Sequence, residues 1–390
     1  MRGIVIPPFY AGQIGAQAAQ RVRRGLGVIP MHFGQPSEGA SPAALAAARA
    51  HVDGRLDGPA GYWESAPLRE RIALHYRDEH RVEVSPERIL LTTGASAGLV
   101  ATFTALFAAG DRVALARPGY PAYRNALRAL GRVPVEIDCG PEHGFRLTPE
   151  LLPPADQTLH GLLVASPANP TGSVLDAADL AALATECRRR GARLLSDEIY
   201  QGITYGRQGV TALQVEPEAL VINSFSKLFR MPGWRIGWLV APVSCVAPLH
   251  SHLINFFLTP PAIAQHAALA AFDDLRLLRR SVETYAANRV RLLEALPTMG
   301  LTGIAPPEGA FYLYVDVGHL TDDSLAFCKE LLDETGLAIA PGIDFDPVRG
   351  SGFVRLSFAI SEHEVEQAIS LLGPWLAGRP KRTGRPTRLS

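Results

Sequence analysis

Short apolar runs alternate with helix-length segments between residues 89 and 240. Such alternation is typical of a parallel sheet whose strands are buried on both faces and connected by covering helices. The pattern predicts seven strands, at Ile89–Thr92, Arg112–Ala116, Val133–Ile137, Gly161–Ala165, Arg193–Ser196, Leu220–Asn223 and Gly237–Val240. We therefore expect an α/β fold with a three-layer domain built on a seven-stranded, mostly parallel sheet.

Helical periodicity fills the intervals between these strands, and the pattern changes after residue 260. Within the sheet region, helices are predicted at Ser96–Ala108, Pro121–Leu130 and Asp176–Arg190. A long helical pattern then runs from Pro261 to about Leu296. It is followed by two strands, Phe311–Val315 and Phe353–Phe358, and by two amphipathic helices, Asp322–Thr335 and Glu362–Trp375. This order predicts a smaller α+β domain after the large one.

The predicted elements divide the chain into four parts. Residues 1–44, with a helical stretch near Gly12–Arg24, form an N-terminal arm and part of the small domain. Residues 45–280 form the large domain and residues 281–376 the small C-terminal domain. Residues 377–390 are basic and rich in proline and glycine, so we expect a disordered tail.

Composition and charge exclude several classes of protein. The chain has 390 residues with 38 basic and 38 acidic side chains, and this balance indicates neither a nucleic-acid partner nor an anionic membrane. The uncharged stretch Ile89–Gly110 mimics a membrane span, but the turn-forming residues Thr92–Ser96 divide it into a strand and a helix. The N-terminus lacks the apolar run of a secretory signal, and the four cysteines form no C-x-x-C pair, so a cytoplasmic location is expected.

Three of the 38 basic residues are lysines, namely Lys227, Lys329 and Lys381. Lysine matters because its amine can form a Schiff base, whereas an arginine guanidinium stays protonated and cannot. Lys381 lies in the basic tail and Lys329 in a helical pattern. Lys227 follows a predicted strand, among small, hydroxyl and aromatic residues, and is therefore the candidate nucleophile. Dinucleotide, Walker A, zinc-protease and G-x-S-x-G signatures are absent from the sequence.

Three sequence blocks around this lysine occur in an order that is known from one family. Asn169–Gly172 reads Asn-Pro-Thr-Gly, Ser196–Tyr200 reads Ser-Asp-Glu-Ile-Tyr, and Asn223–Gly237 contains Ser-Phe-Ser-Lys and Gly-Trp-Arg-Ile-Gly. In order and spacing these blocks resemble the class I/II aminotransferase family of fold type I pyridoxal-phosphate enzymes, over roughly residues 30–375. The resemblance implies pyridoxal 5'-phosphate as cofactor, an amino acid and a 2-oxo acid as substrates, and a homodimer with shared active sites.

The resemblance also implies roles for the residues of these blocks. Lys227 matches the family's Schiff-base lysine, which also moves the substrate's α-proton. Asp197 matches the aspartate that keeps the ring nitrogen of the cofactor protonated. Tyr200 and Asn169 match the pair that hydrogen-bonds the cofactor's phenolic oxygen, and Tyr120 matches the aromatic side chain that stacks on the cofactor ring.

Further positions match phosphate contacts of the family. Gly94, Ala95 and Ser96 open a predicted helix, where free backbone amides and the helix dipole attract an anion. Ser224 and Arg235 stand three residues before and eight residues after the lysine. This is the spacing of the remaining phosphate contacts in the family, so both are expected to bind the phosphate.

Other positions match contacts to the partner subunit and to the substrate. Tyr62 matches the tyrosine that reaches the phosphate of the neighbouring subunit, which would place the active site at a homodimer interface. The segment from Tyr62 to Leu68 is about three residues shorter than the commoner family pattern. Arg355 matches the arginine that binds the substrate α-carboxylate through two parallel hydrogen bonds, with Gly34 and Asn169 beside it.

The expected activity is transfer of an amino group between an L-amino acid and a 2-oxo acid, with ping-pong kinetics. Ser96 stands where some aspartate-preferring relatives carry a lysine, so we expect an apolar or aromatic substrate rather than a dicarboxylic one. The candidates for the apolar pocket are Phe33, Phe256, Phe311 and Tyr312. A carbon–sulfur β-lyase would carry the same cofactor residues and is the alternative. A non-catalytic regulator that binds the cofactor as a sensor is a third hypothesis. Such proteins usually carry a DNA-binding segment, and the first forty residues are too short and too interrupted by glycine and proline for a helix-turn-helix.

Overall fold

The computed structural model describes residues 4–52, 64–207 and 209–380, and it contains a seven-stranded sheet. The strands are β2 Ile89–Thr92, β3 Arg112–Arg117, β4 Val133–Asp138, β5 Gly161–Ala165, β6 Arg193–Asp197, β7 Leu220–Ser224 and β8 Gly237–Val240. Their order across the sheet is β2-β8-β7-β6-β5-β3-β4. Strand β8 is antiparallel to its neighbours β2 and β7, and the other neighbouring strands are parallel. The predicted fold class and the seven predicted strands are confirmed, each strand end to within one residue.

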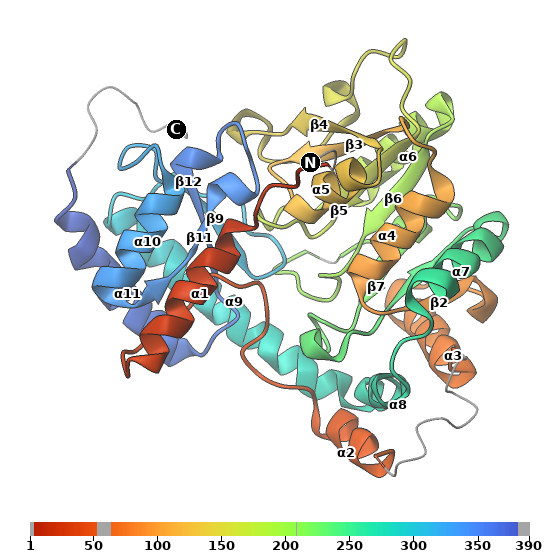
Figure 1. Cartoon of the computed structure of the whole chain (residues 1–390), viewed down its shortest axis with the longest axis horizontal. Coiled ribbons are helices and arrows are strands. Elements are labelled where there is room, and N and C mark those ends of the chain that lie inside the picture. The colour runs from red at the N-terminus through yellow and green to blue at the C-terminus, as the bar shows by residue number, and fades with distance from the viewer. Residues whose placement is uncertain (1–3, 53–63, 208, 381–390) are drawn as a thin grey trace.

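Helices cover both faces of this sheet (Figure 1). One face carries α4 Ala95–Leu106, α5 Pro121–Ala129 and α7 Val243–Phe257, and the other carries α2 Pro42–Ala50, α3 Ala66–His75, α6 Ala177–Arg190 and α8 Ala262–Ala271. Successive side chains of a strand point to opposite faces. Leu194 of β6 therefore packs in the core cluster that contains α6, whereas Leu195 packs in the cluster that contains α4. Burial on both faces explains the continuous apolar runs in the sequence.

A smaller group of strands lies beside the large sheet, on the left of Figure 1. Strands β9 Tyr312–Asp316, β11 Ala340–Pro341 and β12 Phe353–Ser357 form an antiparallel sheet in the order β11-β12-β9, and β1 Ile29–Pro30 pairs in parallel with β10 Leu337–Ala338. Helices α1 Tyr10–Arg23, α10 Ser324–Thr335 and α11 Glu362–Ala377 pack around these strands, and α9 Leu275–Thr298 extends from them towards α8. The predicted smaller α+β part is therefore present.

The helical pattern predicted for residues 261–296 is present, but it is divided between two helices. A 3₁₀ turn at Phe272–Asp274 separates α8 from α9. The ring of Phe272 is 3% exposed and packs edge-on against Phe229, with the ring centres 4.9 Å apart. The carboxylate of Asp274 accepts a hydrogen bond from the backbone amide of Ala43 at 2.8 Å. These tertiary contacts fix the break, and periodicity along the sequence does not reveal them.

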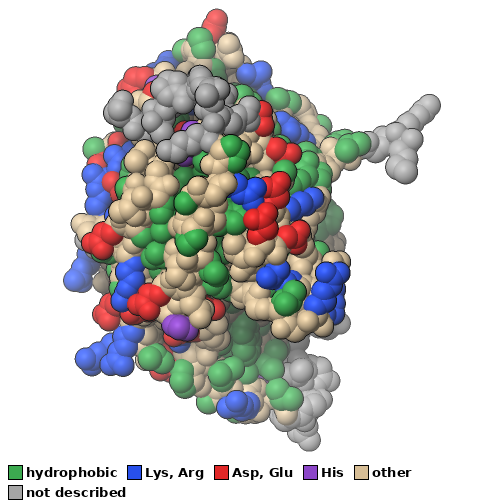
Figure 2. All heavy atoms as spheres, turned by 90° about the vertical axis from the view of Figure 1, so that its left-hand side faces the viewer, with side chains coloured by type: hydrophobic (Ala, Val, Ile, Leu, Met, Phe, Trp, Pro, Cys, Tyr) green, Lys and Arg blue, Asp and Glu red, His purple; other side chains and the backbone are tan. Residues whose placement is uncertain are grey.

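Acidic and basic side chains are mixed on the face of the molecule that Figure 2 shows. Some of these opposite charges form ion pairs between the outer helices. Arg291 of α9 pairs with Glu362 of α11, and Arg379 pairs with Glu330 of α10. The mixture agrees with the formal net charge of zero. Within the described ranges, no helix is both long enough and apolar enough to cross a membrane.

Candidate active site

A cavity of about 220 Å³ lies between the large sheet and the smaller one. Its walls come from the loops after β5, β6 and β7, from the first turn of α4, and from β9 and β12. The carboxyl ends of parallel strands are the usual place for a ligand in an α/β sheet. Ten of the predicted site residues line the cavity: Gly34, Ala95, Ser96, Tyr120, Asn169, Asp197, Tyr200, Lys227, Arg235 and Arg355.

Lys227 lies in the loop that follows β7, and its side chain reaches the cavity. Its Nζ donates a hydrogen bond to the backbone oxygen of Gly34 at 2.5 Å. Burial, and secondly the positive charge of Arg355, lower the pKa of Lys227 to about 8. The neutral amine, which is the form that acts as a nucleophile and proton acceptor, is therefore accessible near neutral pH.

Asp197 is the last residue of β6 and is 3% exposed. Its Oδ2 accepts a hydrogen bond from the Tyr123 hydroxyl at 2.6 Å, and its Oδ1 accepts one from the Ile199 amide at 3.1 Å. Burial raises the pKa of Asp197, while both hydrogen bonds and the charge of Lys227 act in the opposite direction. Tyr123 is missing from the predicted site, although it lies in the first turn of α5 and its ring packs edge-on against that of Tyr120, with the ring centres 5.4 Å apart.

Removal of the Tyr123 hydroxyl is expected to lower kcat about ten- to a hundredfold, because a hydrogen bond to a charged acceptor is worth about 1.5–3 kcal/mol. KM for the amino acid should change little, since the Tyr123 hydroxyl bonds Asp197 and not Arg355, the expected partner of the substrate carboxylate. Steady-state kinetics of Tyr123→Phe measures both constants. Tyr314→Phe is the matched control, because the buried Tyr314 hydroxyl has no hydrogen-bond partner within the described part of the chain. Equal losses in the two variants would contradict this role of Tyr123.

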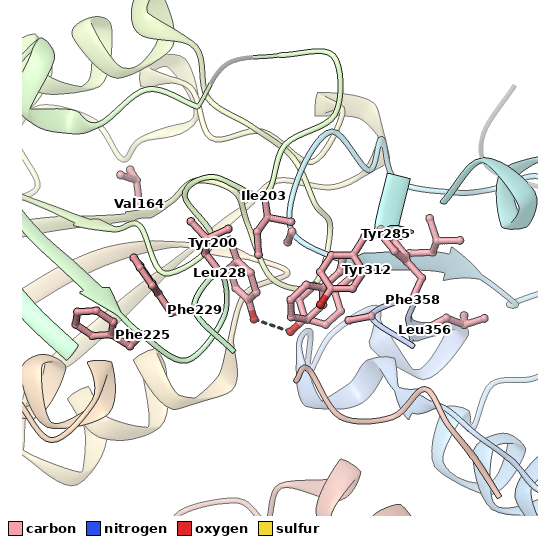
Figure 3. Packing of buried hydrophobic residues seen from close by; sticks show 14 of the residues in the cluster. Val164, Tyr200, Ile203, Phe225, Leu228, Phe229, Tyr285, Tyr312, Leu356 and Phe358 are labelled. Carbon is pink, nitrogen blue, oxygen red and sulfur yellow. Dashed lines mark hydrogen bonds between the residues drawn. The ribbon is translucent and has the colours of Figure 1, made fainter. Parts of the chain in front are cut away.

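Two tyrosines meet where the large sheet faces the smaller one. The hydroxyl oxygens of Tyr200, which follows β6, and Tyr312, which begins β9, are 2.5 Å apart (Figure 3). Burial raises the pKa of Tyr200 well above its ordinary value, so the phenol stays protonated and can donate a hydrogen bond. The guanidinium carbon of Arg355 lies 4.3 Å from the centre of the Tyr312 ring. Tyr312 therefore contacts both Tyr200 and Arg355.

Arg355, in the middle of β12, is 3% exposed and is held by two acceptors. Its Nη1 donates to Asn169 Oδ1 at 3.0 Å, and its Nη2 donates to the backbone oxygen of His32 at 2.7 Å. The buried Nε has no hydrogen-bond partner among the described residues. A guanidinium fixed in this way is suited to bind a carboxylate. Gly34 leaves the space for this arrangement, because a Cβ at that position would collide with the Tyr312 hydroxyl.

The first turn of α4 and Arg235 together form an anion-binding part of the wall. Helix α4 begins at Ala95, and no side chain caps its first turn, so the backbone amides there remain available as donors. The Arg235 guanidinium lies beside this turn and donates to the backbone oxygen of Thr93 at 3.3 Å. Gly94 has φ +84°, and a Cβ on it would collide with Arg235, so glycine is needed for both reasons. A phosphate group fits this combination of amides, helix dipole and guanidinium.

Ser226 lines the cavity, whereas the predicted phosphate contact Ser224 does not. Ser224 is the last residue of β7 and is 2% exposed. Its Oγ lies 2.9 Å from Ser226 Oγ and donates to the backbone oxygen of Ile236 at 3.0 Å. The structure therefore places Ser224 behind Ser226. The sequence has both serines within three residues of the lysine but does not show which of them faces the cavity.

Two of the four residues predicted to form an apolar pocket line the cavity, and two do not. Phe33 and Tyr312 line the cavity, and Phe9 of the N-terminal segment, which was not predicted, lines it as well. Phe311 is fully buried and packs edge-on against Tyr200, so it lies in the core. Phe256 is 60% exposed near the end of α7 and does not line the cavity. Tyr62 lies outside the described residues.

Comparison with known proteins identifies the family. Residues 27–372 match the family model described as Aminotransferase class I and II. This chain therefore belongs to the class I and II aminotransferase family and is a pyridoxal-phosphate-dependent aminotransferase.

Individual relatives match over nearly the whole chain. The valine–pyruvate aminotransferase of Mycobacterium tuberculosis is 44% identical over 375 residues, which cover 95% of this chain and 97% of that protein. The aspartate/prephenate aminotransferase of Thermus thermophilus is 33% identical over 383 residues, with 95% and 97% covered. Among solved structures, an aminotransferase from Mycobacterium tuberculosis has a TM-score of 0.91 at 44% identity, with 95% of this chain and 97% of that chain covered. A putative aminotransferase from Silicibacter pomeroyi has a TM-score of 0.90 at 43% identity, with 96% and 98% covered.

The side chains around the cavity fit pyridoxal phosphate. Lys227 offers an amine for covalent attachment, Asp197 offers a buried carboxylate for the ring nitrogen, and Arg235 with the first turn of α4 offers donors for the phosphate. When bound, this cofactor supplies an electron sink for the electron pair left on the substrate's α-carbon.

Proposed function

We propose that this enzyme transfers the amino group of a branched, apolar L-amino acid such as valine to pyruvate. The charges in the cavity carry the proposal. The cationic lining residues are Lys227, Arg235 and Arg355, and the cofactor and the substrate α-carboxylate together require all three. Among the described lining residues, no cation remains to bind a second substrate carboxylate. Phe9 and Phe33 make part of the cavity surface apolar.

Two further observations support an apolar donor. Ser96, which stands where some aspartate-preferring relatives carry a lysine, lines the cavity with a neutral hydroxyl. The 44% identical relative is named valine–pyruvate aminotransferase. The name of this relative also supports pyruvate as the acceptor.

The proposed roles of the site residues combine the family resemblance with the contacts described above. Arg355 binds the α-carboxylate, held in place by Asn169, and the neutral amine of Lys227 accepts the proton from the substrate α-carbon. With the cofactor bound, the Asp197 carboxylate would hold its protonated ring nitrogen, and the Tyr200 hydroxyl would donate a hydrogen bond to its phenolic oxygen, as the family resemblance implies. The amino acid would leave as a 2-oxo acid while the bound cofactor retained its amino group, and a second 2-oxo acid would take up that group by the reverse sequence. Ping-pong kinetics are expected.

We also propose a cytoplasmic homodimer in which Tyr62 contacts the cofactor phosphate of the other subunit, as the family resemblance implies. The four cysteines are free and buried, as expected for a protein of a reducing compartment. Sedimentation of the holoenzyme as a monomer would contradict the proposed assembly.

The test of the proposed function is the visible absorption of the purified holoenzyme during addition of single amino acids without any oxo acid. Valine should bleach the cofactor's visible band in a single turnover, and pyruvate should restore the band with release of alanine. Aspartate should react at least about tenfold more slowly, because its second carboxylate would be buried without a cationic partner. A faster reaction with aspartate would contradict the proposed substrate. Accumulation of ammonia and pyruvate from cysteine, without an acceptor, would indicate a β-lyase instead.

A further inference from the structure

The sequence neighbours of Phe33 contact the two side chains that are proposed to act on the substrate. The backbone oxygen of the preceding residue, His32, accepts a hydrogen bond from Arg355 Nη2 at 2.7 Å. The backbone oxygen of the following residue, Gly34, accepts one from Lys227 Nζ at 2.5 Å. Under the proposed function, the substrate carboxylate binds Arg355 and the α-proton moves to Lys227, so the α-carbon lies between these two side chains. Phe33 lines the same cavity, so we expect its ring to lie near the substrate's own side chain.

Helix α1 supports the ring of Phe33 from the outside. Gly15 of this helix has no side chain, and a Cβ there would lie 2.6 Å from Phe33 Cζ, so the ring packs directly on the helix backbone. The start of α1 is fixed in turn, because the backbone amides of Tyr10 and Ala11 donate to the carboxylate of Asp344 at 2.8 and 2.7 Å. The position of the Phe33 ring is thus determined by α1, although 37% of this side chain is exposed.

We propose that Phe33, held by its contact with Gly15, sets the upper size limit for the substrate side chain. The proposal rests on the proposed function and deepens it. The cavity of about 220 Å³ is smaller than the roughly 300–1,000 Å³ of typical ligand pockets, and it has to hold the cofactor as well as the amino acid. Under this proposal a branched aliphatic side chain packs on the Phe33 ring, and the ring occupies space that an aromatic side chain would need.

Phe33→Ala tests the proposal in the holoenzyme, with valine and phenylalanine as alternative donors and pyruvate as acceptor. Loss of the ring removes a contact with valine and opens space for phenylalanine. The ratio of the two kcat/KM values should therefore change at least about tenfold in favour of phenylalanine. Leu371→Ala on α11 is the matched control, because Leu371 is 36% exposed and does not line the cavity, and it should leave the ratio unchanged.

Gly15→Ala tests the support of the ring without changing Phe33 itself. The new methyl group has to displace the ring, so the ratio should change in the same direction, by about threefold or more. Gly12→Ala makes the same exchange on the same helix at a position with no atom within 4 Å of the added Cβ. It should leave the ratio unchanged. Alanine favours a helix over glycine, so neither exchange acts by weakening α1.

Equilibrium binding gives a readout that does not depend on turnover. 3-Methylbutanoate and 3-phenylpropanoate have the carbon skeletons of valine and phenylalanine without the amino group, so they bind but do not react. In calorimetric titrations, Phe33→Ala should weaken the first and strengthen the second. The proposal would be overturned if, in Phe33→Ala, both the ratio of the two kcat/KM values and the ratio of the two binding affinities stayed within about twofold of the wild-type ratios. Failure of the wild-type enzyme to use valine would overturn the proposed function instead, and the binding titrations would still decide the role of Phe33.

Discussion

Lys227→Ala is expected to lower kcat for transamination by at least about four orders of magnitude and to abolish the visible band of the bound cofactor. Under the proposed roles, the Nζ atom of Lys227 both attaches the cofactor and moves the α-proton, and alanine can do neither. The other cationic lining residues are Arg235 and Arg355, whose guanidinium groups stay protonated and cannot replace the amine. Steady-state kinetics with valine and pyruvate, together with the absorption spectrum, measures both effects.

Two further substitutions make this result specific. Lys329→Ala changes a lysine of α10 that does not line the cavity, so it should retain kcat within about twofold and keep the visible band. Lys227→Arg keeps a positive charge at the site but removes the amine, so it should be as inactive as Lys227→Ala. Substantial activity in either Lys227 variant would refute the assignment of this residue.

The large sheet can be predicted from the sequence because local chemistry determines it. The run Gly161–Ala165 contains no polar side chain, and both faces of this strand are buried in the fold. The ends of α6 follow from equally local signals. Asp176 and Asp179 form a capping box at its start, and Gly191 ends it with φ +64°.

Other elements are absent from the predicted set because their stability depends on partners that are distant in the sequence. Helix α7 carries Pro248 within its span, a residue that normally ends a helix. Helix α2 is mostly alanine and gains its burial from packing against α8. Strands β10 and β11 have two residues each and exist only through pairing with β1 and β12.

The same distinction applies to the candidate site. Lys227 can be singled out from the sequence because a rare residue type follows an apolar strand, whereas Asp197 is predicted only through the family resemblance of the block Ser196–Tyr200. Tyr123 and Ser226 were missed because their importance lies in the direction of a hydroxyl, which only packing determines. Phe256 was misplaced for the same reason, since an aromatic residue in a sequence does not show which side of its helix meets solvent.

Asp197→Asn is expected to lower kcat by about two to three orders of magnitude while KM for valine changes little. Asparagine has nearly the size of aspartate and can still accept the hydrogen bond from Tyr123, but it carries no negative charge. A neutral amide cannot keep a proton on the cofactor's ring nitrogen, so negative charge that develops at the substrate α-carbon is stabilised less. Steady-state kinetics measures both constants.

Glu198→Gln is the matched control for Asp197→Asn, because it also replaces a buried carboxylate by an amide. Glu198 is buried next to Asp197, but its carboxylate accepts hydrogen bonds from Ser196 Oγ at 2.9 Å and from the Ala212 amide at 2.7 Å, and it does not line the cavity. Glu198→Gln should therefore keep kcat within about threefold. A similar loss of kcat in both variants would mean that the Asp197 effect reflects disturbed packing at the end of β6.

A double-mutant cycle then tests whether Tyr123 acts through the charge of Asp197. In the wild-type background, Tyr123→Phe should cost about ten- to a hundredfold in kcat, because the hydroxyl donates to a buried carboxylate. In the Asp197→Asn background the same substitution should cost less than about threefold, since the charge that strengthens the hydrogen bond is gone. Losses that multiply in the double variant would show that Tyr123 affects the reaction independently of Asp197. Full activity of Asp197→Asn alone would refute the assignment of Asp197 to the ring nitrogen.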